Sequence, residues 1–214
     1  MARDRDARLD LRTLPVASSP FVTARSGPRT LERFRALRLL FTFPGDDLMP
    51  IPSLDLADFK SLEMDFGGTA CWSSVPAVPG WYAVETDAPL NVLAKCPVPA
   101  AGGRHYVIAK RLQDAQLMVE QGAAIIPAGV GARYIVYSGE HGDLKARARK
   151  HIRRSAGTDC LSLARYDIAT AYSWTFFYRK CEAYMPGSQG NKTLRNYLEQ
   201  KWRAEGGWPI LCSR

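Results

Sequence analysis

Residues 132–154 constrain the fold most, because their pattern changes from that of a strand to that of a helix within a few positions. The first part, ARYIVYSG, is rich in β-branched and aromatic residues and is apolar on both sides of the alternation. We therefore expect a strand in the interior of a sheet. After a short polar turn, Asp143 can cap a helix that runs to about Arg154. An apolar residue recurs every fourth position of this helix and forms the side that packs on the sheet: Leu144, Ala148 and Ile152.

The same helix carries basic side chains close to the end of the predicted strand. Arg147 and His151 are four residues apart, so they project from one side of the helix, at the border of its apolar stripe. Tyr137 leaves the strand nearby, and the helix N-terminus adds partial positive charge. A guanidinium, an imidazole and a phenol at one rim suit a phosphodiester. A solvated basic helix face beside a core tyrosine also explains the segment and is favoured by this segment alone, and both interpretations stay open.

Composition indicates a basic globular protein. The 214 residues are 46% apolar and 23% charged, which is ordinary for a soluble protein, but the net charge of +8 favours polyanionic partners. The 5 cysteines show no metal-finger spacing and are expected to be reduced core thiols. We expect a cytoplasmic protein without a membrane partner, because the sequence has neither a signal-peptide core nor a run of about 18 apolar residues.

Further elements follow from the same signals. GWYAVET at residues 80–86 is a compact strand candidate, and residues 105–122 indicate a short strand that continues into a helix. Residues 171–184 contain a third strong strand candidate. Thr193 can cap a last helix that ends at Gly206 and Gly207. These elements describe an α/β (α+β) fold, with helices packed on a small sheet.

Residues 1–78 are predicted to precede the main domain, which spans residues 79–214. The first 28 residues are Arg-rich and then Ser/Pro-rich, and we expect a flexible arm there that either contacts DNA or has no role. Thr30 can cap a helix after this arm. Residues 44–79 are interrupted by prolines and a Gly-Gly pair, so we expect loops with short elements there.

The order of these motifs resembles that of the GIY-YIG nucleases. GWY at residues 80–82 and YSG at residues 137–139 correspond to the two tyrosine motifs, and Arg147 and His151 follow at the family's spacing. Glu199 lies on the last predicted helix, as the family's glutamate does, and a proline follows ten residues later. The resemblance covers about residues 79–214. It implies a small, mainly antiparallel sheet flanked by helices.

The sequence departs from the family pattern at three points. Trp81 and Ser138 replace aliphatic residues of the two tyrosine motifs but leave the tyrosines in place. Cys212 stands where an asparagine is usual, which removes a side-chain amide contact. An insertion at about residues 88–130 lengthens the segment between the two motifs, similar to restriction-type relatives.

The resemblance also implies catalytic roles. Arg147 would stabilise the charge of the transition state, and Tyr82, with a lowered pKa, would accept a proton from water. Tyr137 would orient water or phosphate, and His151 would assist proton transfer or bind a phosphate oxygen. Glu199 would hold one divalent ion, Mg²⁺ or Mn²⁺, in each active site. Basic residues expected to contact DNA are Lys145, Arg149, Lys150, Arg153, Arg154, Lys192 and Arg195.

Each of these residues has an alternative interpretation. Arg195 and Arg203 lie four residues before and after Glu199, so the carboxylate could simply form surface ion pairs. Glu182 is a rival metal ligand, ranked second because it follows a strand instead of lying on the closing helix. The strand tyrosines could be plain core aromatics.

The function expected from these observations is that of an endodeoxyribonuclease, a metal-dependent endonuclease that hydrolyses phosphodiester bonds of double-stranded DNA. Site-specific cleavage of the restriction type is favoured, because a bare catalytic domain needs neither residues 1–78 nor the insertion. Cleavage of both strands at a symmetric site would favour a homodimer. The alternatives are a repair or mobile-element (homing-type) nuclease, a catalytically impaired nucleic-acid-binding protein of the same fold, and an unrelated basic protein. RNA also stays open as a substrate.

Overall fold

The computed structural model describes residues 54–68, 70–98, 106–125, 132–155, 159–184, 186 and 190–212. The chain divides into two compact units, and these residues all belong to the second one, Ile51–Arg214. The arm and the helix predicted within the first 50 residues lie outside the described residues. In the described part of the chain, no helix has the length and apolar character needed to cross a membrane.

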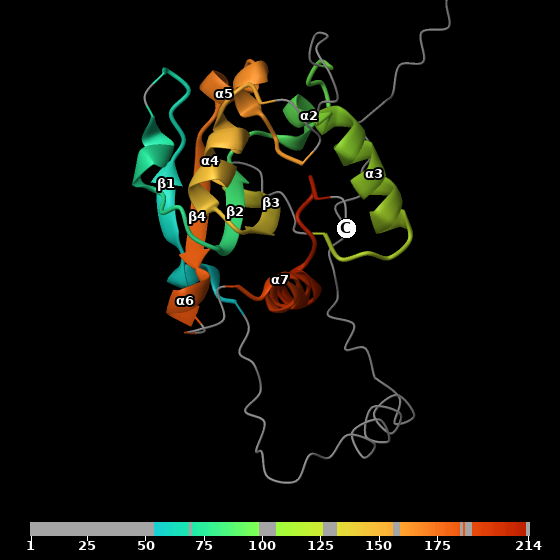
Figure 1. Cartoon of the computed structure of the whole chain (residues 1–214). Coiled ribbons are helices and arrows are strands. Elements are labelled where there is room, and N and C mark those ends of the chain that lie inside the picture. Colours follow the sequence, from blue (N-terminus) through green and yellow to red (C-terminus); the bar gives the residue numbers. More distant parts are fainter. Residues whose placement is uncertain are drawn as a thin grey trace, which may run out of the picture. The chain divides into compact units, whose positions relative to one another are not determined.

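A four-stranded antiparallel sheet in the order β1-β4-β2-β3 forms the centre of the described unit (Figure 1). Its strands are β1 (Lys60–Glu63), β2 (Gly80–Thr86), β3 (Tyr134–His141) and β4 (Trp174–Lys180). β2 pairs with β3 on one side and with β4 on the other, over its whole length. The expected class, an α/β protein with an antiparallel sheet flanked by helices, is thereby confirmed.

Helices surround this sheet. The longer ones are α3 (Ile108–Glu120), α4 (Leu144–Ile152) and α7 (Lys192–Gly206). The shorter ones are η2 (Leu56–Asp58), η3 (Cys71–Ser74), α2 (Leu90–Leu93), η4 (Leu163–Arg165), α5 (Ile168–Ala171) and α6 (Cys181–Tyr184). The short strand predicted before α3 is absent at residues 106–107, where the chain runs directly into the helix.

The caps of α4 and α7 explain where these two helices begin. Asp143 caps α4 as predicted, since its side chain accepts a hydrogen bond from the backbone N–H of Ala146 at 2.9 Å. Asn191, not Thr193, caps α7 by accepting from the N–H of Leu194 at 2.9 Å. Asparagine is at least as good an N-cap as threonine, so the helix begins earlier than expected.

The two faces of the sheet bury separate clusters, because successive side chains of a strand point to opposite faces. Tyr82 and Val84 of β2 pack in one cluster with the apolar stripe of α4. Trp81, the neighbour of Tyr82, packs in the other cluster with Leu198 of α7. α4, drawn over the sheet in Figure 1, and α7 therefore cover opposite faces.

Residues 54–78 belong to this unit, so the boundary predicted at residue 78 does not separate a domain. β1 pairs with β4, and Met64, Trp72 and Val75 are buried in the same cluster as Tyr82. β1 lies in the segment that was predicted to hold loops with short elements, where no strand was named. Its sequence, KSLE, is exposed at nearly every position and therefore lacks the apolar alternation by which a strand is predicted.

β3 lies at the edge of the sheet, and not in its interior as predicted. Its outer edge is nevertheless covered by α7 and the segment that follows it. Three backbone groups of β3 find partners there: Val136 O accepts from Leu211 N at 2.8 Å, Ser138 N donates to Cys212 Sγ at 3.2 Å, and Glu140 N donates to Glu199 Oε2 at 3.0 Å. This cover explains why an edge strand carries the apolar sequence of an interior one.

Candidate active site

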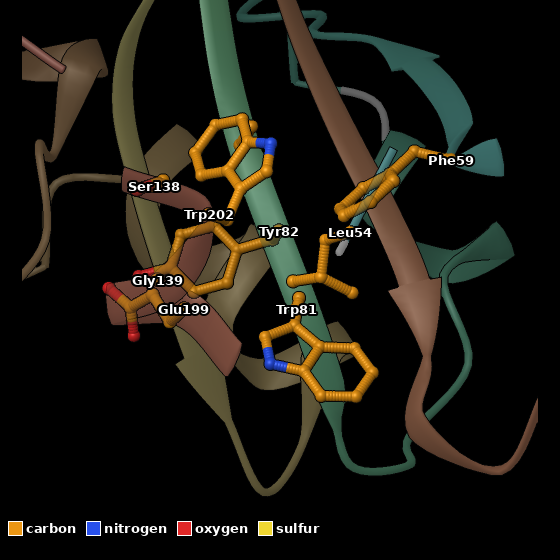
Figure 2. Close-up of a pocket in the computed structure, with 9 residues that line it drawn as sticks. Leu54, Phe59, Trp81, Tyr82, Ser138, Gly139, Glu199 and Trp202 are labelled. Carbon is orange, nitrogen blue, oxygen red and sulfur yellow. The ribbon is translucent and has the colours of Figure 1, made fainter. Parts of the chain in front are cut away.

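Tyr82 and Gly139 form a direct cross-strand pair between β2 and β3. The tyrosine ring lies so close to the glycine that a Cβ atom at position 139 would be 2.3 Å from Tyr82 Oη. Figure 2 shows the Tyr82 ring extending toward Gly139, with the Glu199 carboxylate close by. Only a glycine at this position leaves room for the phenol.

Arg147 meets this phenol from α4. Its side chain is buried, and each of its three nitrogens has a partner: Nε donates to Tyr82 Oη at 2.7 Å, Nη1 to Asp159 Oδ2 at 2.8 Å, and Nη2 to Tyr137 Oη at 3.5 Å. The last distance is at the outer limit of a hydrogen bond. Burial acts to lower the pKa of Arg147, but the two phenols and Asp159 outweigh it and raise that pKa above its ordinary value. The guanidinium is therefore a fixed cation.

The rings of Tyr82 and Tyr137 stack with centroids 6.2 Å apart and an interplanar angle of 18°. Burial raises the pKa of Tyr82 well above its ordinary value of 10.0, although the charge and the hydrogen bond of Arg147 oppose this. Burial also raises the pKa of Tyr137 to about 12. Both phenols are protonated at neutral pH, and the lowered pKa expected for Tyr82 is not found.

His151 lies one turn after Arg147 and is fully buried against the two tyrosine rings, at centroid distances of 5.2 and 5.1 Å. Its Nδ1 accepts a hydrogen bond from Leu161 N at 3.2 Å, so the neutral imidazole carries its proton on Nε2. Nε2 is buried and has no hydrogen-bond partner among the described residues. Burial, with a contribution from Arg147, lowers the pKa of His151 well below 6.5. His151 is therefore a neutral packing partner of the tyrosines.

Glu199 approaches from α7 at the outer edge of β3. Its side chain is buried, its Oε2 accepts from Glu140 N, and its Oε1 forms an ion pair with Arg203. Burial raises the pKa of Glu199 above its ordinary value of 4.5, while Arg203 and Arg147 act to lower it. The charge of Glu199 in turn acts on the pKa of both tyrosines. The carboxylate thus lies within electrostatic reach of Arg147.

Arg203 is buried in this group, although its sequence position predicts only a surface ion pair with Glu199. Its Nε donates to Ser138 Oγ at 2.9 Å, and its Nη2 donates to Ser138 O at 2.8 Å and to Cys212 Sγ at 3.3 Å. Arg203 therefore joins Glu199, β3 and the segment after α7. The spacing of four residues from Glu199 indicates the ion pair, but it does not reveal that the pair is buried.

A small cavity of about 10 Å³ adjoins the carboxylate and is lined in part by Tyr82, Gly139 and Glu199 (Figure 2). This volume is roughly that of one water molecule. A carboxylate oxygen is the kind of ligand that Mg²⁺ prefers, but this cavity has no room for the several water ligands that the ion retains. No group of three or more His, Cys, Asp or Glu side chains could hold a metal within the described ranges. Glu182, the rival ligand, is exposed on α6.

Most basic residues predicted to contact DNA lie at the surface. Arg149, Arg153, Arg154 and Lys192 are exposed, and Lys145 and Lys150 are partly exposed. Arg195 differs, because it is buried and forms an ion pair with Glu140 at 2.9 Å. It belongs to the packing of α7 on β3, and it is not part of this basic surface.

Comparisons with known proteins found no family model, no curated protein and no solved structure that matches this chain. The class of site is therefore defined by its own geometry. The site consists of the buried guanidinium of Arg147, which contacts two phenols, and the neutral imidazole of His151, which packs against both phenol rings. The Glu199 carboxylate lies at the edge of the antiparallel sheet.

Proposed function

We propose that the chain is a metal-dependent endonuclease that hydrolyses DNA phosphodiester bonds with a GIY-YIG-like site. One observation carries this proposal: Arg147 contacts Tyr82 and Tyr137 directly, and Tyr82 lines the same small cavity as Glu199. These residues come from separate strands and helices. If the motifs matched by accident, there would be no reason for these side chains to gather at one rim.

Arg147 supplies the cation that the reaction needs. Phosphodiester hydrolysis gathers negative charge on nonbridging oxygens in the transition state, so a cation fixed there lowers the barrier. The contacts to Tyr82, Tyr137 and Asp159 hold the guanidinium in place before DNA arrives. Such preorganisation is what makes a charged group effective in a site of low dielectric.

Glu199 is the residue that would hold the divalent ion, Mg²⁺ or Mn²⁺. When bound, such an ion neutralises charge on the leaving oxygen. Tyr82 and Tyr137 are protonated hydrogen-bond donors. The Tyr137 hydroxyl donates to Asp159 O in the DNA-free protein, and the Tyr82 hydroxyl would orient water or a phosphate oxygen. His151 packs against both rings and acts as a positioning residue.

Exposed basic residues on and directly after α4 extend the positive surface from the site. Arg149 lies on α4, and Arg153 and Arg154 follow its last residue, Ile152. Such residues contact phosphates and fix the position of DNA without reading its sequence. We further propose site-specific cleavage of the restriction type, by a homodimer if the target is symmetric.

The test is cleavage of supercoiled plasmid in the presence of Mg²⁺. We expect discrete fragments from the wild type and a loss of at least about 100-fold for Arg147→Ala and for Glu199→Gln. Glu205→Gln is the matched control, because Glu205 lies on the same helix but is exposed and paired with Lys201. Equal cleavage by all four proteins would contradict the assignment of the site.

A second function is a nucleic-acid-binding protein of the same fold without catalysis. Two observations favour it: both Glu199 oxygens already have protein partners, and Cys212 stands in place of the family's asparagine. The plasmid assay separates the two functions, because retarded but intact DNA supports the binding protein. Smeared products indicate a nonspecific nuclease instead. DNA binding by either class should weaken with salt. The logarithm of the binding constant should fall linearly with the logarithm of the salt concentration, with a slope of about 0.9 for each phosphate contact.

A further inference from the structure

Asp159 pairs with Nη1 of Arg147, whereas Nε and Nη2 contact the two tyrosines. Its Oδ2 lies 2.8 Å from Arg147 Nη1 and 3.7 Å from Lys150 Nζ. The side chain of Asp159 is 55% exposed, whereas that of Arg147 is 8% exposed. The other two guanidinium nitrogens face Tyr82 and Tyr137. The Asp159 carboxylate therefore stands between the buried cation and solvent, on the side from which an anionic ligand would approach.

We propose that Arg147 and Lys150 form the subsite for a nonbridging oxygen of the scissile phosphodiester, and that the Asp159 carboxylate occupies this subsite until DNA displaces it. A guanidinium binds carboxylate and phosphate oxygens in the same way, and a lysine ammonium adds a point charge to either. The inference rests on the proposed function and adds a competitor for the substrate within the chain itself.

The geometry allows Asp159 to leave the subsite without unfolding its backbone. Tyr137 Oη donates to the backbone carbonyl of Asp159 at 3.3 Å, so the main chain is held independently of the carboxylate. Partial burial acts to raise the pKa of Asp159, but Arg147 and Lys150 outweigh it and hold that pKa below its ordinary value. The carboxylate is thus ionised at neutral pH, and a phosphate oxygen that takes its place at Arg147 Nη1 must break this ion pair.

Asp159 also has a structural use, which explains why a competitor is tolerated. A buried guanidinium with an unsatisfied N–H is costly in the absence of substrate. Asp159 satisfies Arg147 Nη1 until a phosphate oxygen does so. Asparagine at position 159 would keep an oxygen acceptor for this nitrogen but remove the charge, so Asp159→Asn is the informative substitution.

The structure provides a closely matched control in Asp58. Its Oδ2 lies 2.8 Å from Arg179 Nη1, and its side chain is also 55% exposed. Asp58→Asn therefore removes the same charge from an ion pair of the same length outside the proposed site, although Arg179 Nη1, unlike Arg147 Nη1, makes no hydrogen bond among the described residues. We would measure binding of a labelled duplex by fluorescence anisotropy, without divalent metal so that DNA is not cut, with thermal unfolding of each variant as a check of the fold.

Asp159→Asn is expected to bind the duplex about fivefold or more tightly than Asp58→Asn at the same ionic strength. A further Lys150→Met substitution should reverse part of this gain, since it removes the second cation of the subsite. Equal affinities for the two Asn variants would overturn the inference, because overall charge alone would then explain the effect. Weaker binding by Asp159→Asn than by the wild type would also overturn it.

Failure of this inference is distinguishable from failure of the proposed function. If the wild type cuts plasmid with Mg²⁺ but Asp159→Asn and Asp58→Asn bind DNA with equal affinity, only the proposal that Asp159 competes with DNA is rejected. If the wild type neither binds nor cuts DNA, both the proposed function and the proposed competition by Asp159 are rejected. The same 214-residue chain is used in every measurement.

Discussion

The phenol of Tyr82 passes directly over Gly139, and a Cβ atom at that glycine would come within 2.3 Å of Tyr82 Oη. The absence of a side chain allows the phenol to reach Arg147, whose Nε donates to it at 2.7 Å. Tyr137 and Gly139 are two residues apart on β3, so they share the face that Tyr82 occupies. The Tyr-x-Gly motif thus supplies one phenol and makes room for the other.

Gly139→Ala should displace the Tyr82 ring and weaken its contact with Arg147. We expect at least a tenfold loss of plasmid cleavage, and a loss of about 1–3 kcal/mol in the free energy of unfolding measured with urea. Gly142→Ala is the control, since a Cβ there would meet nothing within 4 Å. Wild-type activity in Gly139→Ala would show that the position of Tyr82 is irrelevant to cleavage.

Tyr82→Phe tests the phenol itself. The substitution leaves Arg147 Nε without its acceptor, which should cost roughly 1–3 kcal/mol in unfolding free energy and abolish most cleavage. Tyr134→Phe is the matched control, because Tyr134 is also buried on the sheet and donates to Ala88 O at 2.6 Å. Both variants should lose stability, but only Tyr82→Phe should lose activity. Parallel losses of activity would assign Tyr82 to packing alone.

Arg203→Met should be strongly destabilising. It leaves the buried Glu199 carboxylate and the Ser138 carbonyl without the guanidinium, which typically costs about 3–5 kcal/mol. Lys201→Met removes the cation of a more exposed i,i+4 pair on the same helix and should cost less than about 1 kcal/mol. Urea denaturation distinguishes the two. Similar small losses in both variants would show that the Arg203 pair behaves as a surface pair.

The pH dependence of cleavage should report Glu199. Burial raises its pKa above 4.5, and only the ionised carboxylate can hold a divalent cation. Cleavage should therefore decline as the pH falls through a value above 4.5. Removing Arg203 takes away a cation that lowers this pKa, so in Arg203→Met the acidic limb of kcat/KM should move to higher pH. If the acidic limb of kcat/KM stays at the same pH in a folded Arg203→Met variant, this limb reports the titration of another group.

His151 should make stability depend on pH. Its pKa is lowered in the folded protein, so between that value and about 6.5 the unfolded chain binds more protons than the folded one. Stability is then lost as the pH falls below about 6.5, by up to about 1.4 kcal/mol per pH unit. His151→Asn keeps an acceptor for Leu161 N and should remove this component. Urea titrations of both proteins at several pH values measure the difference in slope.

Local signals predicted the elements that build the site. The strand at residues 80–86 was predicted with the bounds that β2 has, because aromatic and β-branched residues are bounded by prolines and polar residues. Asp143 was predicted as the cap of α4 from its position before an apolar stripe. The order of the motifs then predicted that Tyr82, Tyr137 and Arg147 would meet. Periodicity and capping are local properties, so they can be recognised in sequence.

The remaining features depend on contacts between distant segments. The partners of Arg203 on β3, and the position of Asp159 over Arg147, follow from how α7 and a loop pack on the sheet. Burial decided the protonation of Tyr82 and removed Arg195 from the basic surface. Residue type and spacing give no measure of burial. β1 escaped prediction because its four residues form a mostly exposed edge strand.

The cover on β3 has a consequence for the behaviour of variants. Leu211, Cys212 and Glu199 occupy backbone groups that would otherwise offer a template for a strand from another molecule. A substitution that detaches this segment would uncover an apolar strand with unpaired amides, and the resulting species would self-associate into aggregates. A loss of soluble yield in such variants would then reflect the exposed backbone hydrogen-bonding groups of β3. It would carry no information about hydrolysis.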